Sequence, residues 1–447
     1  SEGTATITVS TEDGAFTDTA IVPVEDWTSS GAELILHYDM KGADGHVVPD
    51  QAGSHDGEWV NADRAVHLAG DASGMLLFSG GSVDSYIKLP PGILDGLSSI
   101  TVSALVNWDG ARKANWVYAL GTDNRKYLYY TPDYPSSAGG ARLGMSTGSW
   151  QTEVSAKGPT LRANEWKLVT TVLDGESGKL ILYVDGEEIA SADVSYTLDQ
   201  ILDPAGPSGY IGRSMYAEDP YYGGAIADFR IYDGALNKQE IRELQEEAAA
   251  RLEQLNLLIL RHVADSLDAL ILGANPDLHE VTSNLNLPQK GMLGTGIAWT
   301  SSDESVITPG GVVTRPDPAA GDRAVKLVAT LTNGGAVWTK EIQVTVKRLP
   351  DDAESVEAAR EALIVHHIDD VRGHLHLPTK GLHGTSITWT SSDPDVITPT
   401  GEVSRPKHGQ GDVTVTLTAT ARKNSVSKNK IFQALVRELP EPEPYAG

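Results

Sequence analysis

The sequence contains no cysteine and no long apolar run, and each absence removes a class of function. Without cysteine, the chain has no disulfides, no thiolate metal ligands and no cysteine nucleophile. No stretch approaches the roughly 20 apolar residues of a transmembrane helix, so we predict no membrane span. The segment Ser1–Ser10 also lacks the basic and apolar regions of a signal peptide.

Basic residues are scarce. The 447 residues include 35 lysines and arginines against 61 aspartates and glutamates, which gives a formal charge of −26. Binding to phosphate requires concentrated positive charge, so this balance argues against a nucleic-acid partner. It favours solubility and leaves carboxylates available for hard cations such as calcium.

One segment of the sequence occurs twice. Leu287–Pro316 returns as Leu377–Pro406, so Trp299 corresponds to Trp389. Modules repeated side by side are usually spacers or binders. The strand patterns of the two copies predict Ig-like β-sandwiches, in which the matched tryptophans fill the cores. The second copy has His374 where the first has an asparagine, which favours a solvent-facing strand position over a metal ligand.

The rest of the chain is predicted to be mainly β, with a long helix. Short alternating strands bounded by turns predict a jelly-roll sandwich, and Asn237 with Glu240 forms a capping box at a helix start. A helical pattern at Glu354–Asp370 precedes the second repeat. The predicted order is the end of a preceding Ig-like domain of a longer protein (1–24), a linker (25–32), the sandwich (33–236), a linking α-helix (237–265), two Ig-like repeats (266–349 and 350–438) and a Pro-rich acidic tail (439–447).

Several phrases of the sequence resemble known modules. Residues 33–245 resemble the laminin-G-like (LamG), concanavalin A-like modules of secreted bacterial glycosidases, in phrases such as Leu36–Trp59 and Ala163–Ile189. Residues 266–438 resemble atrophied bacterial Ig-like repeats, and the N-terminal strands resemble the end of an Ig-like group 2 domain. The resemblance implies a secreted or cell-surface bacterial protein, and an accessory region of an arabinofuranosidase or arabinanase.

The same resemblance implies one structural calcium ion. Asp39, Asp50 and Asp228 match the ligand positions of related modules, and main-chain oxygens near His55 would complete the shell. Calcium takes six to eight oxygen ligands, which these groups can supply. The alternative is that Asp39 and Asp50 stabilise turns.

Aromatic residues near two loops form a candidate carbohydrate site, because flat rings pack against the C–H groups of sugars. Tyr127 and Tyr129 share one face of their strand, whereas Tyr130 points the other way. Strands also favour aromatic residues for packing, so some of these side chains can be core residues. The candidates are Trp116, Tyr127, Tyr129, Tyr134, Tyr216, Tyr221 and Tyr222, and Trp150 could join the same face.

No residue is predicted to be catalytic. Glycosidases on this scaffold alternate carboxylates along one strand as E-x-D-x-E, and the sequence has no such motif. We predict a non-catalytic carbohydrate-binding and spacer region of a secreted multimodular glycoside hydrolase that acts on arabinose-containing plant polysaccharide. Its partners would be a polysaccharide or oligosaccharide and a catalytic domain of the same or an associated chain. The alternatives are a structural stalk or adhesion array without glycan affinity, and a divergent glycosidase.

Overall fold

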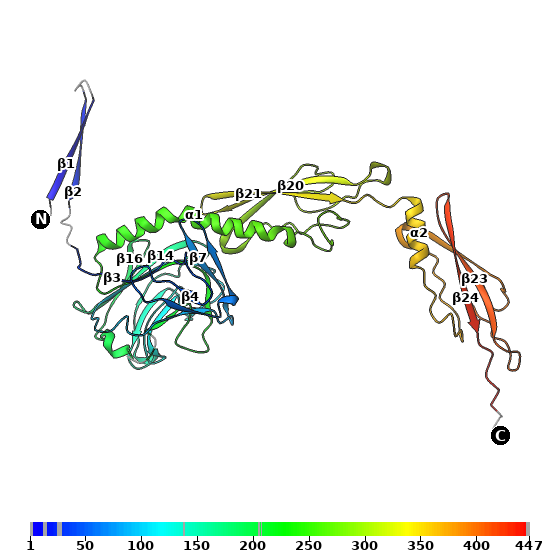
Figure 1. Ribbon diagram of the computed structural model, residues 1–447, viewed down its shortest axis with the longest axis horizontal. Coiled ribbons are helices and arrows are strands. Elements are labelled where there is room, and N and C mark those ends of the chain that lie inside the picture. The colour runs from blue at the N-terminus through cyan, green and yellow to red at the C-terminus, as the bar shows by residue number, and fades with distance from the viewer. Residues whose placement is uncertain are drawn as a thin grey trace. The chain divides into compact units, whose positions relative to one another are not determined.

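The computed structural model describes residues 3–11, 16–24, 29–136, 139–203, 206 and 208–443, and it is mainly β, as predicted (Figure 1). The chain forms two compact units. The first comprises Ser1–Ile271, Leu287–Thr300 and Val328–Ile342, and the second comprises Leu272–Asn286, Ser301–Leu327 and Gln343–Gly447. The boundary passes through the first repeat, so part of that repeat belongs to the same unit as the sandwich.

Within its described residues, the sandwich is built from sixteen strands. They are β3 (Leu34–Tyr38), β4 (Val47–Val48), β5 (Gly57–Val60), β6 (Ala65–Ala69), β7 (Gly74–Gly81), β8 (Tyr86–Leu89), β9 (Ile100–Trp108), β10 (Tyr118–Asp123), β11 (Lys126–Thr131), β12 (Arg142–Ser146), β13 (Val154–Lys157), β14 (Trp166–Asp174), β15 (Lys179–Val184), β16 (Glu187–Asp193), β17 (Gly209–Ile211) and β18 (Tyr221–Tyr232).

These strands form two antiparallel sheets of eight. The first, called the β10 sheet, has the order β13-β12-β11-β10-β17-β8-β5-β4. The second, called the β18 sheet, has the order β16-β15-β14-β9-β18-β7-β6, with β3 paired to β18. The hydrophobic core lies between the sheets: in β8, Ile87 and Leu89 are buried in it, while Tyr86 and Lys88 alternate to the outer face.

Helix α1 (Lys238–Leu270) packs on the outer face of the β18 sheet (Figure 1). Asn237 caps it, because its side chain accepts from the backbone N–H of Glu240, whose carboxylate accepts from the N–H of Asn237 at 2.8 Å. The capping box therefore forms as predicted. The helix ends at Leu270 and not at residue 265, since its buried apolar face continues through Leu267. It belongs to the same compact unit as the sandwich.

The predicted N-terminal strands are present as β1 (Gly3–Ser10) and β2 (Thr17–Val24). They pair antiparallel, with Ser10 opposite Thr17. The predicted Asp-Gly turn between them lies outside the described residues, as do residues 25–28 of the predicted linker and 444–447 of the tail.

Each repeat contains a three-stranded sheet. The strands are β19 (Gly296–Ser301), β20 (Arg323–Asn333) and β21 (Ala336–Val346) in the first, and β22 (Ser386–Ser391), β23 (Val413–Lys423) and β24 (Val426–Val436) in the second. In the second repeat, irregular segments with isolated bridges such as Ile397 to Val403 cover this sheet. Trp299 and Trp389 are buried, and their Nε1 atoms donate to the carbonyls of Pro288 and Pro378 at 2.8 and 2.9 Å.

Helix α2 (Asp352–Ala362) precedes the strands of the second repeat and is shorter than the predicted helix. Asp351 caps it by accepting from the N–H of Glu354 at 2.9 Å. The chain then turns extended at Leu363, because Leu363 and Val365 are buried in the core of the repeat. Within the described part of the chain, neither helix is both long enough and apolar enough to cross a membrane.

Candidate functional site

A pocket of about 160 Å³ on the outer face of the β10 sheet brings together five of the seven predicted aromatic residues. They are Trp116, Tyr127, Tyr129, Tyr134 and Tyr216. Tyr127 and Tyr129 of β11 point out of the sandwich, whereas Leu128 and Tyr130 point into its core. The predicted alternation along this strand is therefore confirmed.

The floor of the pocket is an aromatic cluster. The ring of Trp116 is stacked on that of Tyr129, with centroids 3.8 Å apart and planes at 18°. Tyr127 meets Tyr129 edge-on at 5.6 Å, and Tyr216 meets Trp116 edge-on at 5.9 Å. Such pairs contribute about 0.5–1.5 kcal/mol each beyond their buried area. The floor is therefore rigid before any ligand binds.

Glu153 provides the polar centre of the pocket. Its carboxylate accepts hydrogen bonds from the hydroxyls of Tyr127 and Tyr129 at 3.1 and 3.2 Å, and from Arg142 at 3.3 Å. Burial raises the pKa of Glu153 above its ordinary value, although the Arg142 charge and the two tyrosine hydroxyls oppose this shift. A carboxylate has about four acceptor sites. Three are occupied, which leaves capacity for one ligand hydroxyl.

Gly144 of β12 makes this arrangement possible. A Cβ atom at this position would lie 2.4 Å from Cε1 of Tyr129 and 3.1 Å from the carboxyl carbon of Glu153. Real Cβ atoms do not approach other atoms so closely, so any other residue would displace the Tyr129 ring. The glycine thus allows Tyr129 and Glu153 to meet over the strand.

Two loops form the rim. Asp133 fixes the first, because its Oδ1 accepts from the N–H of Gly140 at 2.8 Å and from the hydroxyl of Thr160 at 3.0 Å. This loop carries Tyr134, whose ring lies under the guanidinium of Arg142 at 3.2 Å from the centroid. The second rim loop carries Trp150, which is 63% exposed.

The backbone at Trp150 is strained. Ser149, immediately before it, has a φ of 96°, which non-glycine residues rarely adopt. Strained backbone of this kind costs about 1–3 kcal/mol and clusters at ligand sites. Here the strained turn holds a large aromatic side chain in solvent beside the pocket.

The third element of the pocket is the loop that carries Tyr216 and Asp219. The hydroxyl of Ser214 donates to Asp219 at 2.6 Å and accepts from the N–H of Tyr216 at 3.0 Å. Burial raises the pKa of the Asp219 carboxyl, while the Ser214 hydrogen bond opposes the shift. The hydroxyl of Tyr216 lies 3.3 Å from that of Tyr127, which connects this loop to Glu153.

The two remaining aromatic candidates lie elsewhere. Tyr222 belongs to the core between the two sheets, where it packs on Phe78, so it cannot touch a ligand at this surface. Tyr221, its neighbour in β18, points the opposite way and stacks on Tyr86. The inclusion of Tyr222 in the predicted site is therefore corrected: successive side chains of a strand point to opposite faces.

Sequence reasoning missed the polar half of the pocket. Glu153 and Asp219 belong to no recognisable motif, and Arg142 reads as an ordinary strand residue. A weak signal was available: Trp150 lies three residues before Glu153, next to a strand pattern that begins at Val154. Only the fold shows that these side chains face the tyrosines of β11.

Comparisons with known proteins agree with this fold. Residues 79–242 match the family model described as the concanavalin A-like lectin/glucanases superfamily. Residues 263–349 and 356–439 each match the model of the atrophied bacterial Ig domain. The chain contains one concanavalin A-like domain followed by two atrophied bacterial Ig domains.

An alpha-L-arabinofuranosidase of Bifidobacterium longum subsp. longum is 27% identical over 375 residues, which cover 77% of this chain and 31% of the relative. The chain thus spans about a third of the length of this curated relative. Among solved structures, domain 4 of a GH43 extracellular arabinanase from Geobacillus stearothermophilus, in complex with arabinotriose, matches with a TM-score of 0.38 and 20% identity over 48% of this chain and 98% of that chain. The CBM40 of a Ruminococcus gnavus IT-sialidase, bound to alpha2,3 sialyllactose, matches with a TM-score of 0.31 and 15% identity over 38% and 96%.

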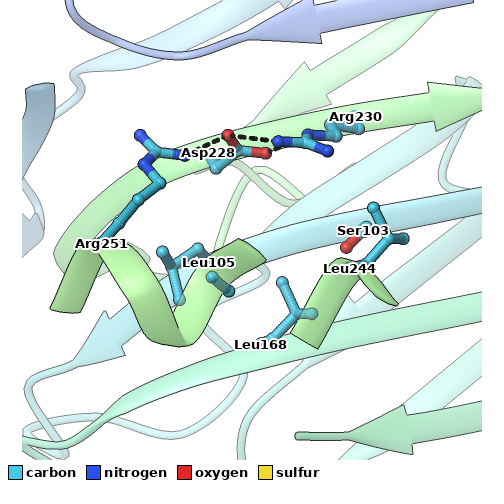
Figure 2. Close-up of a pocket in the computed structure, with 8 residues that line it drawn as sticks. Ser103, Leu105, Leu168, Asp228, Arg230, Leu244 and Arg251 are labelled. Carbon is cyan, nitrogen blue, oxygen red and sulfur yellow. Dashed lines mark hydrogen bonds and ion pairs between the residues drawn. The ribbon is translucent and has the colours of Figure 1, made fainter. Parts of the chain in front are cut away.

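The predicted calcium ligand Asp228 lies on the opposite side of the concanavalin A-like domain, under α1. Figure 2 shows its carboxylate between two guanidinium groups. Arg230 Nε donates at 2.9 Å and Arg251 Nη1 at 2.5 Å, while His37 Nε2 lies at 3.0 Å. The adjoining cavity of about 10 Å³ has room for no more than a single water molecule. Two positive charges at the carboxylate do not fit a calcium ligand.

The other predicted ligands are engaged in turns. Oδ1 of Asp50 accepts from the N–H groups of His37 and Ala52, and Oδ2 accepts from that of His55, at 2.9–3.1 Å. Asp39 accepts from the N–H of Lys41 at 3.0 Å. Among the residues that the structure describes, no group of three or more His, Asp or Glu side chains is arranged to hold a metal ion. This donor set does not fit the calcium site that the resemblance implies, and the ion stays an untested prediction.

The segment Gly144–Gly148 reads Gly-Met-Ser-Thr-Gly and so has the G-x-S-x-G spacing of a serine nucleophile. Ser146 is buried at the end of β12. Its hydroxyl donates to the carbonyl of Ser149 at 2.6 Å and lies 3.0 Å from the Thr152 hydroxyl. These contacts stabilise a turn, and none of them involves a histidine base.

Proposed function

We propose that the concanavalin A-like domain binds a neutral, arabinose-containing polysaccharide through the pocket formed by Trp150, Tyr216 and Glu153. The observation that carries this proposal is the combination of a rigid aromatic floor with two carboxyl groups and an exposed tryptophan at the rim. Sugars present flat C–H faces to rings and hydroxyls to carboxylates. Arg142 is already paired with Glu153, so an acidic sugar would meet the Glu153 and Asp219 carboxylates in the described lining of the pocket.

The sugar class comes from the curated relative, an alpha-L-arabinofuranosidase. We infer that the chain is an accessory region of a secreted bacterial protein of this kind, in which the Ig domains act as spacers. The repeated modules support the spacer role, since the buried Trp299 and Trp389 fill the cores of their own repeats. The partner would be a catalytic domain of the same or an associated chain.

The test is affinity electrophoresis of the full chain in gels that contain arabinan, arabinoxylan or no polysaccharide. We expect retardation by arabinan, and its loss in Trp150→Ala. Phe16→Ala is the matched control, because it removes another exposed aromatic ring from the described residues. Migration that no polysaccharide slows would contradict the proposal and favour a purely structural stalk.

The pocket also contains two carboxyl groups, the minimum set for glycoside hydrolysis. Each is held by donors from the protein: Glu153 by Tyr127, Tyr129 and Arg142, and Asp219 by Ser214. This favours a binding role over a catalytic one. Release of arabinose from arabinan by the purified chain, abolished in Glu153→Gln, would make the domain an enzyme and contradict the accessory role.

A further inference from the structure

A second aromatic cluster lies on the same outer face of the β10 sheet. Tyr86 of β8 is stacked on Tyr221, with ring centroids 5.9 Å apart and planes at 20°. Tyr210 of β17 meets Tyr86 edge-on at 5.6 Å. All three rings are half-buried, in contrast with the fully buried floor of the pocket, so part of each remains accessible to a ligand.

Arg213 completes this cluster. Its guanidinium lies 4.5 Å from the ring centroid of Tyr210 and 4.9 Å from that of Tyr86, and Nη1 donates to the Tyr86 hydroxyl at 3.2 Å. A guanidinium has five N–H donors. No ion pair of Arg213 with a carboxylate is found in the described ranges, so donors remain for the hydroxyl oxygens of a sugar.

The register of the sheet relates this cluster to the pocket. Ala119 of β10 is paired with Tyr129 on one side and with Tyr210 on the other. Adjacent strands are about 4.8 Å apart, so the backbones of Tyr129 and Tyr210 are separated by about 10 Å. Linked sugar rings can span such a distance. The residue between the two tyrosines, Ala119, is buried in the cluster against which Met215 and Tyr216 pack, so a bound chain would pass over the side chains of the loop after β17.

The loop that follows β17 connects the two clusters. Arg213 contacts Tyr86 and Tyr210 at its start, while Tyr216, three residues later, contacts Trp116 and Tyr127 of the pocket. The outer face of the β18 sheet is covered by α1, so the β10 sheet carries the open face of the sandwich. One loop therefore contributes side chains to both clusters on that face.

We propose that Tyr86, Tyr210, Tyr221 and Arg213 form a second subsite, which binds the same polysaccharide chain as it leaves the pocket and passes over the loop that follows β17. This inference rests on the proposed function of the pocket. The domain then recognises a run of several linked sugars, and a single sugar fills only the pocket.

The test is isothermal titration calorimetry of the full chain with arabino-oligosaccharides of one to five residues. We expect the affinity of the wild-type chain to rise with length. Tyr210→Leu keeps an apolar side chain but removes the flat ring, and Arg213→Gln removes the charge. Each should weaken binding of the pentasaccharide roughly three- to tenfold, the size of an aromatic contact, and leave binding of the shortest ligands unchanged.

The outcomes separate the two proposals. Trp150→Ala should weaken binding at every length, because it alters the pocket itself, whereas Phe16→Ala should change nothing. Wild-type affinity that does not depend on length, or an equal effect of Tyr210→Leu at all lengths, would overturn the second subsite and leave the pocket. Absence of binding at every length would contradict the proposed function and the second subsite together. Melting curves of both subsite variants establish that they remain folded.

Discussion

Arg251 of α1 donates a hydrogen bond to Asp228 of β18 at 2.5 Å, and Asp228 is only 4% exposed (Figure 2). Arg251 of the helix thus neutralises a buried carboxylate of the β18 sheet. Arg251 also donates to the carbonyl of Ala227 at 3.2 Å. The guanidinium therefore supplies positive charge at one of the positions where the family resemblance implies calcium.

Replacement of Arg251 by methionine should destabilise the sandwich. It keeps an unbranched apolar stem but removes one of the cations at a buried carboxylate, and loss of a partner from a buried pair costs about 3–5 kcal/mol. Arg230 and His37 remain, so we expect about 2 kcal/mol, measured by urea unfolding. Arg242→Met, an exposed arginine of the same helix, is the control. An equal effect of both variants would mean that the Asp228 contact contributes nothing.

Acid should weaken the same contact. Burial acts to raise the pKa of Asp228, but the His37 hydrogen bond and the Arg230 and Arg251 charges outweigh it, so this pKa lies below its ordinary value. The resulting stability is present above about pH 4, the value in the unfolded chain, and is lost as pH falls through the folded pKa. Scanning calorimetry should show that Asp228→Asn loses part of the acid dependence, whereas the exposed Glu58→Gln keeps it.

Chelation should leave the melting temperature of the sandwich unchanged. The oxygens of Asp50 accept three backbone hydrogen bonds and those of Asp228 accept from two arginines, so neither is arranged for a calcium ion. Melting curves with EDTA and with added calcium check this. A calcium-dependent rise that Asp50→Asn removes would support the ion that the resemblance implies.

Substitution of Gly144 by alanine should perturb the pocket. The new Cβ would meet Tyr129 at 2.4 Å, which forces the ring off Trp116 and moves Glu153. Overpacking of this kind costs about 1–3 kcal/mol, and we expect weaker arabinan binding in affinity gels as well. Gly373→Ala is the matched control, because a Cβ there meets no atom within 4 Å. Full binding by Gly144→Ala would argue against a role for Tyr129 and Glu153.

Comparison of the two repeats leads to a prediction for His374. Its Nδ1 accepts from the N–H of Val403 at 2.9 Å, and Asn284 of the first repeat accepts from Val313 at the same distance. His374→Asn should therefore leave the free energy of unfolding unchanged, whereas His374→Ala should lower it by about 0.5–1.5 kcal/mol. Urea unfolding distinguishes these outcomes. An asparagine variant as unstable as the alanine variant would contradict the shared structural role.

The local features were predictable from the sequence, because neighbouring residues decide them. The Asn237 capping box and the opposite faces of Tyr129 and Tyr130 depend on spacings of a few residues. The equivalence of Trp299 and Trp389 follows from direct repetition. Helix ends were less predictable: α1 continues beyond residue 265 because Leu267 is buried, and α2 ends at Ala362 because Leu363 turns into the core, and both burials depend on distant segments.

The tertiary structure alone decided which groups form the pocket and what neutralises Asp228. Glu153 reaches Tyr127 and Tyr129 because β11, β12 and β13 lie side by side and Gly144 leaves room between them. Arg251 reaches Asp228 because α1 folds back over the β18 sheet, which the residues around Arg251 do not specify. The sequence therefore determined the modules and the alternation of inward and outward side chains along their strands. Strand pairing and helix packing determined which groups form the pocket and which neutralise Asp228, because both bring together side chains that are far apart along the chain.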